Sequence, residues 1–320
     1  MSTISTDRSA RPRWAMLAVV LVVSALVAAL LATNSWRFAA GDSGRGSIVD
    51  DSFKLSASNT GVPLPTFRTA TFNLLGYGHT APGGDAPRYE DGVTRMGYAV
   101  RILQNRGIQV VGFQEFQEQQ FNRFKELVGD TWQTYPGATL TSAAMQNSIA
   151  WRTDTWELMA ARNVPVVYAY GAWIKMPFVL LRDKASGRLV WFANFHNSYD
   201  KGTNQQKYRD QARAIEVNLA NQLWESGVPL VLTGDMNEST KYFCDMTTLA
   251  PMKSAAGGSY NSTTCTPPAD QRIDQIFGST YLQFANYSVI RTKLVRKATD
   301  HPVVYADVSV PVRPRPTPKS

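Results

Sequence analysis

Residues 231–237 read Val-Leu-Thr-Gly-Asp-Met-Asn, and this stretch decides the fold of the 320-residue chain. An apolar run of strand type ends there at Asp235, and Asn237 follows two residues later. The same pattern, an apolar strand that runs into a polar residue, recurs along the chain at Asn73, Glu115, His196 with Asn197, Asp274, and Asp300 with His301. Polar residues at strand ends gather at one edge of a sheet, where α/β proteins commonly build their sites.

Short runs rich in β-branched and aromatic residues predict the strands around this stretch. They lie at residues 69–72, 109–113, 148–151, 178–182, 189–195, 229–233, 273–277 and 303–310. Apolar residues spaced three and four apart predict helices over 93–106 and 208–223, and a glycine follows each of them. The short polar segment after residue 182 indicates an antiparallel hairpin, so we expect mixed strand directions. Many strands and few helices favour an α/β fold with two packed sheets and helices outside them.

The composition is that of a globular protein. Apolar residues make up 44% of the chain and charged residues 18%, which is enough to bury a sizeable core. Two cysteines exclude a small disulfide scaffold and a Cys-rich zinc array. The net charge of +8 lies mostly at the ends, since residues 1–36 carry +2 and residues 313–320 carry +3. The charge alone therefore does not indicate a nucleic-acid partner.

The N-terminal residues predict export. Residues 15–32 carry no charge and are almost all Ala, Val, Leu or Met, with three arginines before them and a tryptophan on each side. We expect residues 15–36 to be a transmembrane signal-anchor, since the run is longer than that of a usual signal peptide. A cleaved signal peptide is the alternative. The positive-inside rule places residues 1–14 in the cytoplasm and the rest of the chain outside it.

The predicted organisation has one domain between two irregular segments. Residues 37–65 are rich in Gly, Ser, Asp and Asn and predict a flexible linker. Residues 66–311 form the domain, and residues 312–320 are a tail that alternates proline with basic residues. The expected location is the cell membrane, as a single-pass protein with an extracytoplasmic domain. If the N-terminal segment is cleaved, the domain is secreted.

Each polar residue at a strand end has a simpler explanation when it is taken alone. An Asn or Asp after a strand commonly forms a turn, and a lone His is more often structural. Asp274 is harder to explain in this way, because it lies in a mostly apolar strand beside Ile273 and a buried acid needs a partner. Two of only three histidines, His196 and His301, also lie in these motifs. The combination favours a functional site.

The ordered motifs resemble those of the endonuclease/exonuclease/phosphatase superfamily: Asn73, Glu115, His196, Gly234-Asp235-x-Asn237, Asp274 and Asp300-His301. This group includes pancreatic-type deoxyribonucleases, abasic-site endonucleases, bacterial sphingomyelinases and inositol-phosphate 5-phosphatases. The resemblance covers residues 66–311. It implies a four-layer α/β sandwich with two central mixed sheets and metal-dependent hydrolysis of phosphoesters. Leu75 stands where abasic endonucleases carry an acid, and a basic, aromatic insertion for gripping duplex DNA is not evident, so a DNA-repair enzyme is not indicated.

The resemblance, together with the chemistry of the side chains, predicts a divalent-metal site. Glu115 is the expected direct ligand, with Asn73 and Asp300 beside it. Sites of this oxygen-rich kind suit Mg²⁺, which keeps part of its hydration shell. Mn²⁺ and Ca²⁺ are the alternatives, and the lack of thiolates argues against a closed zinc site.

The remaining motif residues are expected to carry out the catalysis. Asp235 is expected to orient or deprotonate the attacking water, and Asn237 to hold a nonbridging phosphate oxygen. His196 and His301, the latter oriented by Asp274, are expected to donate hydrogen bonds to the negative charge that develops in the transition state. An imidazole that titrates near neutral pH can also act as a general acid or base.

Further residues have weaker signals. His79, Arg152 and Asn197 are expected to contact the substrate, while a loop histidine and a solvated strand-end arginine are the simpler explanations for His79 and Arg152. Cys244 and Cys265 are 21 residues apart in a domain expected to be exported. We expect them to form one disulfide, worth roughly 3 kcal/mol by loop entropy. Two buried thiols are the alternative.

Three functions are compatible with these residues. The preferred one is an extracytoplasmic, metal-dependent phosphodiesterase or nuclease. The second is a sphingomyelinase-like, phospholipase C-type enzyme that acts on a phospholipid head group, for which the apolar and aromatic residues 165–181 would insert into lipid unless they are core strands. The third, an inactive surface binding module, is disfavoured by the complete set of motifs. We expect no obligate protein partner beyond the membrane and the phosphodiester substrate.

Overall fold

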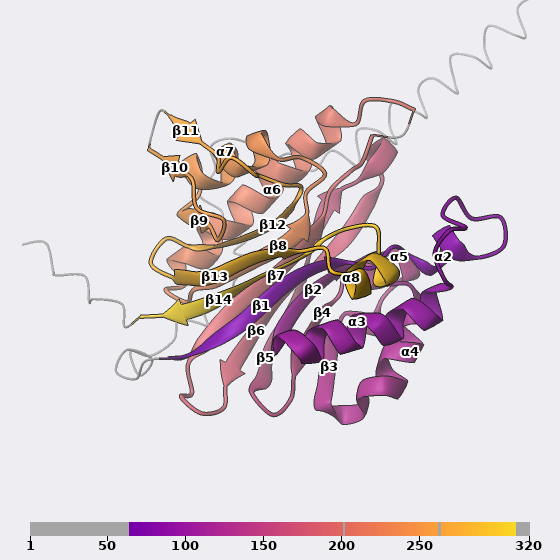
Figure 1. Cartoon of the computed structure of the whole chain (residues 1–320). Coiled ribbons are helices and arrows are strands. Elements are labelled where there is room, and N and C mark those ends of the chain that lie inside the picture. The colour runs from indigo at the N-terminus through magenta and orange to yellow at the C-terminus, as the bar shows by residue number, and fades with distance from the viewer. Residues whose placement is uncertain (1–63, 201, 262–263, 312–320) are drawn as a thin grey trace, which may run out of the picture. The chain divides into compact units, whose positions relative to one another are not determined.

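The first of two six-stranded sheets contains both the earliest and the last strand of the fold (Figure 1). The computed structural model describes residues 64–200, 202–261 and 264–311. In this sheet β1 and β2 run parallel, and the other neighbouring strands run antiparallel. Its strands, in spatial order, are β13 (Gln283–Ile290), β14 (Val303–Val310), β1 (Leu64–Asn73), β2 (Val110–Gln114), β4 (Ile149–Arg152) and β3 (Trp132–Tyr135).

The second sheet is also mixed. Here β7 and β8 run parallel, and the other neighbouring strands run antiparallel. Its strands, in spatial order, are β5 (Trp156–Val167), β6 (Trp173–Asp183), β7 (Leu189–His196), β8 (Leu230–Asp235), β12 (Asp274–Ser279) and β9 (Met252–Ser254). A small separate hairpin pairs β10 (Ser259–Tyr260) with β11 (Cys265–Thr266).

Helices cover the outer face of each sheet, so the fold has four layers (Figure 1). The first sheet is covered by α3 (Gly92–Arg106), α4 (Glu118–Val128) and α8 (Lys293–Ala298). The second is covered by α6 (Gln206–Glu225) and α7 (Thr240–Thr248). The short helices are α2 (Tyr77–Thr80) and α5 (Ser142–Met145), with single 3₁₀ turns η3 (Gly129–Thr131), η4 (Gly137–Thr139) and η5 (Ala169–Gly171). The four-layer α/β sandwich expected from the sequence is confirmed.

The two sheets pack through an apolar layer built from alternate residues of both. Phe67 of β1, Trp156 of β5 and Phe192 of β7 are buried there, with ring centroids 5.0, 5.7 and 5.4 Å apart. Their rings meet edge to face, an arrangement that adds to the gain from burying the aromatic surface. This layer fixes the two sheets against each other and therefore fixes the ends of their strands.

A polar contact joins the sheets just below the strand ends. Gln114 Nε2 donates to Asn194 Oδ1 at 2.7 Å, and Asn194 Nδ2 donates to the carbonyl of Phe113 at 2.8 Å. Thr233 Oγ1 lies 3.2 Å from the same Asn194 oxygen. Gly112 leaves room for this contact, since a Cβ there would lie 2.1 Å from Thr233 Oγ1. These directional hydrogen bonds therefore fix the position of one sheet relative to the other, which apolar packing alone would specify less strictly.

The longer helices begin and end where the sequence indicates. In α3 the Asp91 carboxylate accepts from the backbone N–H groups of Val93 and Thr94, and Gly107 ends the helix in the left-handed conformation. This helix was expected over 93–106 and the second over 208–223, and α3 and α6 correspond to them. The helices α4, α7 and α8 were not predicted.

All eight predicted strand runs lie in strands of the two sheets, namely β1, β2, β4, β6, β7, β8, β12 and β14. The long strands β5 and β13 were not among the predicted strand runs. Both are edge strands, and β13 is half exposed, with a break in register around Asn286. The apolar signal that reveals a strand is weak at an edge, because only one neighbour and part of one face are covered. Residues 165–181 cover the end of β5, the turn after it and most of β6, and residues 176–181 of β6 are buried in the core.

The predicted N-terminal anchor and most of the predicted linker lie outside the described residues. β1 begins at Leu64, so the last residues of the predicted linker belong to a strand. Across residues 64–311, with the gaps at 201 and 262–263, no helix is both long enough and apolar enough to cross a membrane. The predicted tail at 312–320 also lies outside this range.

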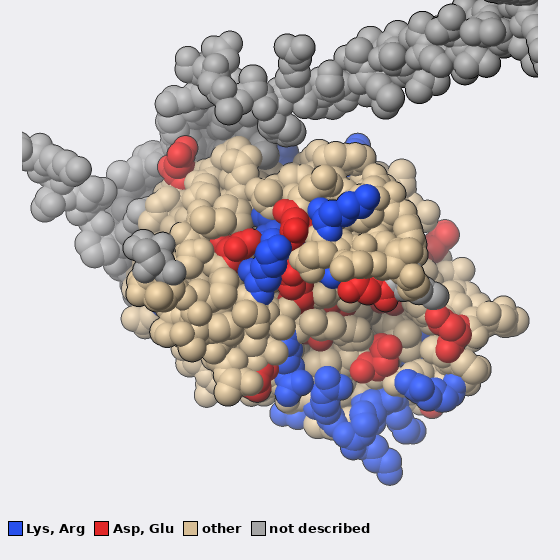
Figure 2. All heavy atoms as spheres, turned by 90° about the horizontal axis from the view of Figure 1, so that it is seen from above, with Lys and Arg blue, Asp and Glu red and all other residues tan. Residues whose placement is uncertain are grey.

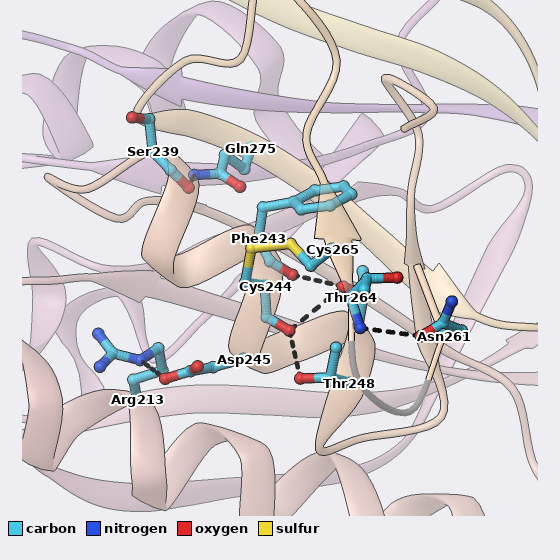
Figure 3. The surroundings of a disulfide bond; sticks show 11 residues. Arg213, Ser239, Phe243, Cys244, Asp245, Thr248, Asn261, Thr264, Cys265 and Gln275 are labelled. Carbon is cyan, nitrogen blue, oxygen red and sulfur yellow. Dashed lines mark hydrogen bonds and ion pairs between the residues drawn. A yellow bond between two sulfur atoms is a disulfide. The ribbon is translucent and has the colours of Figure 1, made fainter. Parts of the chain in front are cut away.

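A disulfide connects α7 to the small hairpin (Figure 3). The Cα atoms of Cys244 and Cys265 lie 5.5 Å apart. Beside it, Thr248 Oγ1 donates to the carbonyl of Cys244 at 2.7 Å, and Asp245 pairs with Arg213 of α6. The disulfide therefore fastens the long connection before β12 to the helix that follows the Asp-x-Asn motif.

Candidate active site

The ends of four central strands bring the predicted site residues to one edge of the fold. β1 and β2 end together, with Asn73 opposite Gln114, and β7 and β8 end together, with His196 opposite Asp235. β12 runs the other way, so its first residue, Asp274, lies opposite Asp235. Parallel strands share an edge for their ends, which is why these residues meet although they lie far apart in the sequence.

Asp235 lies at the centre of the assembled residues. Its Oδ2 accepts a hydrogen bond from Asn73 Nδ2 at 3.1 Å and lies 3.7 Å from Nε2 of both His196 and His301. Its Oδ1 accepts from the backbone N–H of Asn237 at 3.0 Å. The side chain is buried, and these donors compensate for the water that its carboxylate has lost. One carboxylate oxygen thus faces two imidazoles from different sheets.

His301 is held in one orientation by Asp274. Both carboxylate oxygens of Asp274 lie 3.0 Å from His301 Nδ1, so Nε2 is the nitrogen that faces Asp235. Burial raises the pKa of Asp274, and the nearby Asp235 adds to the effect. Burial alone would lower the pKa of His301, but the hydrogen bond and the charge of Asp274 outweigh it and raise that pKa. His301 is therefore a hydrogen-bond donor near neutral pH.

Glu115 lies beside Asn73 in a strained backbone conformation. Asn73 Nδ2 donates to its Oε1 at 2.9 Å, and the backbone N–H of Gly76 donates to its Oε2 at 2.8 Å. Burial disfavours the charged form, but hydrogen bonds from His79, Gly76 and Asn73 lower the pKa of Glu115 below its ordinary value. Its φ of +57° is uncommon for a residue with a side chain and is typical of functional sites. Glu115 is therefore an ionised carboxylate whose direction is set by an unusual backbone conformation.

His79 contacts the same carboxylate from the exposed side. Its Nε2 lies 3.2 Å from Glu115 Oε2, and its Nδ1 lies 2.6 Å from Asp85 Oδ1. The hydrogen bond to Glu115, with that to Asp85, raises the pKa of His79 to about 9 in spite of burial. The sequence suggested a substrate contact for His79, and the structure places it against the predicted metal ligand.

Asn197 and Asn237 lie beside Asp235 and are hydrogen-bonded to the backbone around it. Asn237 has a φ of +49°, and its Nδ2 donates to the carbonyl of Asn197 at 2.9 Å. The backbone N–H of Asn197 donates to the carbonyl of Asp235 at 2.9 Å. The amide nitrogen of Asn237 is therefore engaged with the chain and helps to hold the two strand ends together.

Two other predicted site residues lie in different surroundings. Asp300 is exposed and follows Thr299, whose hydroxyl donates to the carbonyl of Asn73 at 2.7 Å, so it belongs to the same edge. Arg152 does not. It ends β4, which runs antiparallel to β2, and its backbone N–H bonds Gln109 at the opposite end of the sheet, where its side chain pairs with Asp154. The expectation of a substrate contact at Arg152 is therefore wrong.

Arg95 supports the site and was missed in the sequence. Its guanidinium is buried and donates to the carbonyls of Leu74 at 2.5 Å and Ala298 at 3.1 Å, and its Nε donates to that of Glu90 at 2.8 Å. These bonds connect the segment after Asn73, the end of α8 and the start of α3. Its position could have indicated burial, because Arg95 lies four residues before Ala99 and therefore on the same apolar face of α3.

The oxygen donors suit a hard divalent cation. Glu115 is ionised and partly exposed, Asp300 is exposed nearby, and no thiolate lies among the site residues described. Ligand atoms of Asp235, Asp274 and His301 also lie within 4.8 Å of one another. Both oxygens of Asp274 face His301 Nδ1, however. We therefore assign Asp235, Asp274 and His301 to proton transfer and to contacts with the phosphate rather than to metal binding. Asn73 Nδ2 donates to the carboxylates of Glu115 and Asp235, and its Oδ1 accepts a hydrogen bond from the N–H of Leu75.

The sequence matches the profile of the Endonuclease/Exonuclease/phosphatase family over residues 70–301. The chain belongs to this family. The match spans the strand ends from Asn73 to His301, and it confirms the resemblance seen in the motifs. Members of the endonuclease/exonuclease/phosphatase family hydrolyse phosphoester bonds and are generally dependent on divalent metals. Among curated proteins, none matches this chain.

Solved structures of the endonuclease/exonuclease/phosphatase family share the fold. A mannosyl-6-phosphatase from Bacteroides thetaiotaomicron is 17% identical, with a TM-score of 0.59 over 76% of this chain and 99% of its own. The human Nocturnin catalytic domain with bound sulfate is 18% identical, with a TM-score of 0.56 over 77% and 96%. D. rerio TDP2 complexed with a single-strand DNA product is 12% identical, with a TM-score of 0.56 over 77% and 99%. At these identities the likeness shows the fold and leaves the substrate open.

Proposed function

We propose that this protein is a divalent-metal-dependent phosphodiesterase whose domain lies outside the cytoplasm. The observation that carries the proposal is the position of Asp235. One of its oxygens faces Nε2 of His196 and of His301 at 3.7 Å each and is bonded to Asn73, which also bonds Glu115. A base, two imidazole donors and an anionic metal ligand therefore surround one small space, and these are the groups that phosphoester hydrolysis requires.

In the proposed reaction a water molecule attacks phosphorus while Asp235 accepts its proton. The bond from the water oxygen to phosphorus forms, the ester bond to the leaving oxygen breaks, and that oxygen takes up a proton from solvent water. Asp235 then returns its proton to the solvent. A diester is thereby converted into a monoester and an alcohol. His196 and His301 donate hydrogen bonds to the nonbridging oxygens as negative charge develops there. Asp274 keeps the His301 ring turned so that Nε2 faces the phosphate.

Glu115 is the proposed principal ligand of the cation, with Asp300 and Asn73 beside it. A divalent cation bound there neutralises charge on the phosphate group. The chain's own part is to keep Glu115 ionised, through bonds from the Gly76 N–H and from His79. Mg²⁺ is the proposed ion because the donors are oxygens, with Mn²⁺ and Ca²⁺ as alternatives.

The proposed location rests on the sequence and on the disulfide. Residues 15–32 are apolar and uncharged, which supports an N-terminal anchor or signal. The bond between Cys244 and Cys265 supports an oxidising compartment, since such bonds are rare in the reducing cytosol.

A phospholipase C-type activity is the second candidate. The observation in its favour is the tip of the β5–β6 hairpin, where Tyr170 and Trp173 are exposed beside the site. An inactive binding module is disfavoured, because the side chains of every predicted catalytic motif meet at one edge.

The test is a side-by-side activity screen of the purified full-length chain. Bis-p-nitrophenyl phosphate, plasmid DNA, RNA and sphingomyelin are each offered with Mg²⁺ and with EDTA. We expect metal-dependent hydrolysis of the first of these, abolished in Asp235→Asn and retained in the matched control Asp130→Asn, whose side chain is exposed at the far end of α4. Full activity in EDTA, or full activity of Asp235→Asn, would overturn the proposal.

A further inference from the structure

Six exposed cations lie along one flank of the site. They are carried by α8 and the turn before it, by α3 and by the segment before α3, and we call them the basic rim: Arg88, Arg101, Arg291, Lys293, Arg296 and Lys297. Figure 2 shows Lys and Arg gathered along one edge of this face, beside a hollow that contains Asp and Glu. Arg88, Arg296 and Lys297 line a cleft of about 300 Å³ together with Tyr89 and Glu90.

The charge of the basic rim is not neutralised by acids in the part of the chain that the structure describes. Among the described residues, none of the six cations lies within ion-pair distance of a carboxylate. Some cations elsewhere are paired, as Arg182 is with Glu157 at 2.6 Å. Glu90, the acid in the cleft, accepts hydrogen bonds from Tyr98 at 2.9 and 3.0 Å. The rim is therefore an electropositive surface open to an anion from outside.

The basic rim is joined rigidly to the catalytic residues. α8 ends at Ala298, three residues before His301, and Arg95 bonds the carbonyl of Ala298 at 3.1 Å. The segment that carries Arg88 is tied to the site on its other side, because the N–H of Ala86 donates to the carbonyl of His79 at 2.8 Å. An anion on the rim would thus lie at a fixed position relative to the phosphate being cleaved.

A second, chemically different flank lies beside His196. The ring of Tyr168 packs on that of His196 with centroids 5.6 Å apart, and the hairpin tip that follows exposes 63% of Tyr170 and 61% of Trp173. Tyr199, three residues after His196, is 39% exposed. We call Tyr170, Trp173 and Tyr199 the aromatic rim.

Strand alternation places Trp173 on the catalytic face of its sheet. Trp173 is an even number of residues from Val179 and Leu181, which face the other sheet, and His196 is an even number from Phe192, which does so too. β6 and β7 are neighbours, so Trp173 and His196 project from the same face of adjacent strands at the same end. The aromatic rim belongs to the second sheet, whereas the basic rim packs on the first.

We propose that the substrate is a single nucleic-acid strand, with flanking phosphates on the basic rim and an unstacked base on the aromatic rim. This inference rests on the proposed function and names its substrate class. A cationic track combined with aromatic side chains for stacking is the usual way in which proteins bind single strands without sequence preference. In a duplex the bases stay paired and stacked inside the helix, so none is available to stack on the aromatic rim.

A membrane surface fits these features less well. At the site edge the large exposed hydrophobic side chains of the described residues are all aromatic, and two of the three are tyrosines. A segment that inserts into lipid presents Leu, Phe or Trp from an apolar face. A phospholipid head group also offers one phosphate, while the basic rim extends over six cations.

The test measures binding of fluorescein-labelled dT20 to the full-length chain in EDTA, at several salt concentrations, by fluorescence anisotropy. Arg296→Gln with Lys297→Gln should weaken binding at least tenfold at low salt and reduce the slope of log K against log salt by about 1.4, because two phosphate contacts are lost. Trp173→Ala should weaken binding about fivefold or more with the slope unchanged. The controls are Arg182→Gln with Lys184→Gln, and Met159→Ala, all at the opposite end of the same strands.

Three results would overturn the proposal. They are wild-type affinity in the Arg296/Lys297 variant, tighter binding of a 20-base-pair duplex than of dT20, and binding of phosphatidylserine vesicles that Trp173→Ala abolishes while dT20 binding is untouched. Wild-type turnover of bis-p-nitrophenyl phosphate with Mg²⁺ tests the proposed function separately, because that compound has no flanking phosphate. Turnover without dT20 binding overturns only this inference, and dT20 binding without turnover overturns only the proposed function.

Discussion

Asp235 and Asp274 are directly opposite each other on the antiparallel strands β8 and β12, and the imidazole of His301 bridges their carboxylates. Nδ1 of His301 lies 3.0 Å from Asp274, and Nε2 lies 3.7 Å from Asp235. Two buried carboxylates this close would repel each other, and a protonated imidazole between them offsets that repulsion. The three side chains therefore act as a unit.

The first prediction tests this unit by substitution. His301→Ala should lower turnover of bis-p-nitrophenyl phosphate at least about 10²-fold, because one preorganised donor is lost. Asp274→Asn should cost no more than that, and the double variant little more than His301→Ala alone, since residues that act as a unit are not additive. His196→Ala should cost a similar factor by itself.

Thermal unfolding serves as the control for folding, and NMR titration of the His301 ring supplies a readout that packing alone does not move. Because the Asp274 carboxylate raises the pKa of His301, Asp274→Asn should lower that pKa. Multiplied losses in the double variant would show that Asp274 does not work through His301.

The second prediction concerns Glu115. Glu115→Gln keeps the shape of the side chain and removes the charge that is proposed to hold the cation. Turnover should fall by orders of magnitude and recover in part at higher Mg²⁺ or Mn²⁺, because weaker binding is overcome by mass action. Glu118→Gln, on the first turn of α4, is the matched control and should leave the metal dependence unchanged. A Glu115→Gln enzyme with the wild-type metal requirement would exclude Glu115 as a ligand.

The third prediction concerns Glu216, which is buried under the site between α6 and α7. Tyr242 Oη donates to its Oε2 at 2.6 Å. Burial raises the pKa of Glu216 to about 7 from its ordinary 4.5, against the opposing effect of bonds from Tyr242 and Asn197. The folded state therefore binds more protons than the unfolded state between these two pH values, and stability falls as the pH rises through this window.

Glu216→Gln removes this dependence. The variant should be more stable than the wild type at pH 8, by up to about 3 kcal/mol, and close to it at pH 4.5. Urea unfolding at both pH values measures the difference, with Glu225→Gln, exposed at the end of α6, as the control. Equal gains at both pH values would show that the effect is not one of ionisation.

The sequence predicts which polar residues lie at strand ends, because strand ends are encoded locally. An apolar run followed by a polar residue marks the end of a strand, as at Asn73 and Asp235, and parallel neighbours share that edge. The limit of this signal is visible at Arg152, which also ends an apolar strand. β4 is antiparallel to β2, so its end lies at the opposite edge, and strand direction is set by long-range pairing that no local pattern records.

Arg95 and the polar contact between the sheets show a second limit. Arg95 donates to Ala298, 203 residues away, and Gln114 donates to Asn194, 80 residues away. Either residue would look ordinary beside its neighbours in the sequence, since its partners are assembled only when the sheets pack. The edge strand β13 was missed for a local reason, because its half-exposed sequence contains too few apolar residues in alternation to predict a strand.

The last prediction concerns Gly112, which packs against Asn194 and Thr233 of the other sheet. A Cβ at this position would lie 2.1 Å from Thr233 Oγ1 and 2.3 Å from Asn194 Oδ1, both buried and hydrogen-bonded. Gly112→Ala must displace these groups, so we expect a loss of roughly 1–3 kcal/mol in the free energy of unfolding. Turnover should fall as well, because Asn194 and Thr233 lie two residues before His196 and Asp235.

Gly97 provides the matched control. It lies within α3, and a Cβ there would meet no atom within 4 Å, so Gly97→Ala should stabilise the protein by up to about 1 kcal/mol through helix propensity. Thermal unfolding should therefore move the two variants in opposite directions, by about 2–4 °C for each kcal/mol in a domain of this size. If Gly112→Ala melts at or above the wild-type temperature with full turnover, the sheets can separate at this point at no cost. The polar contact beneath the site would then have no part in positioning the catalytic strand ends.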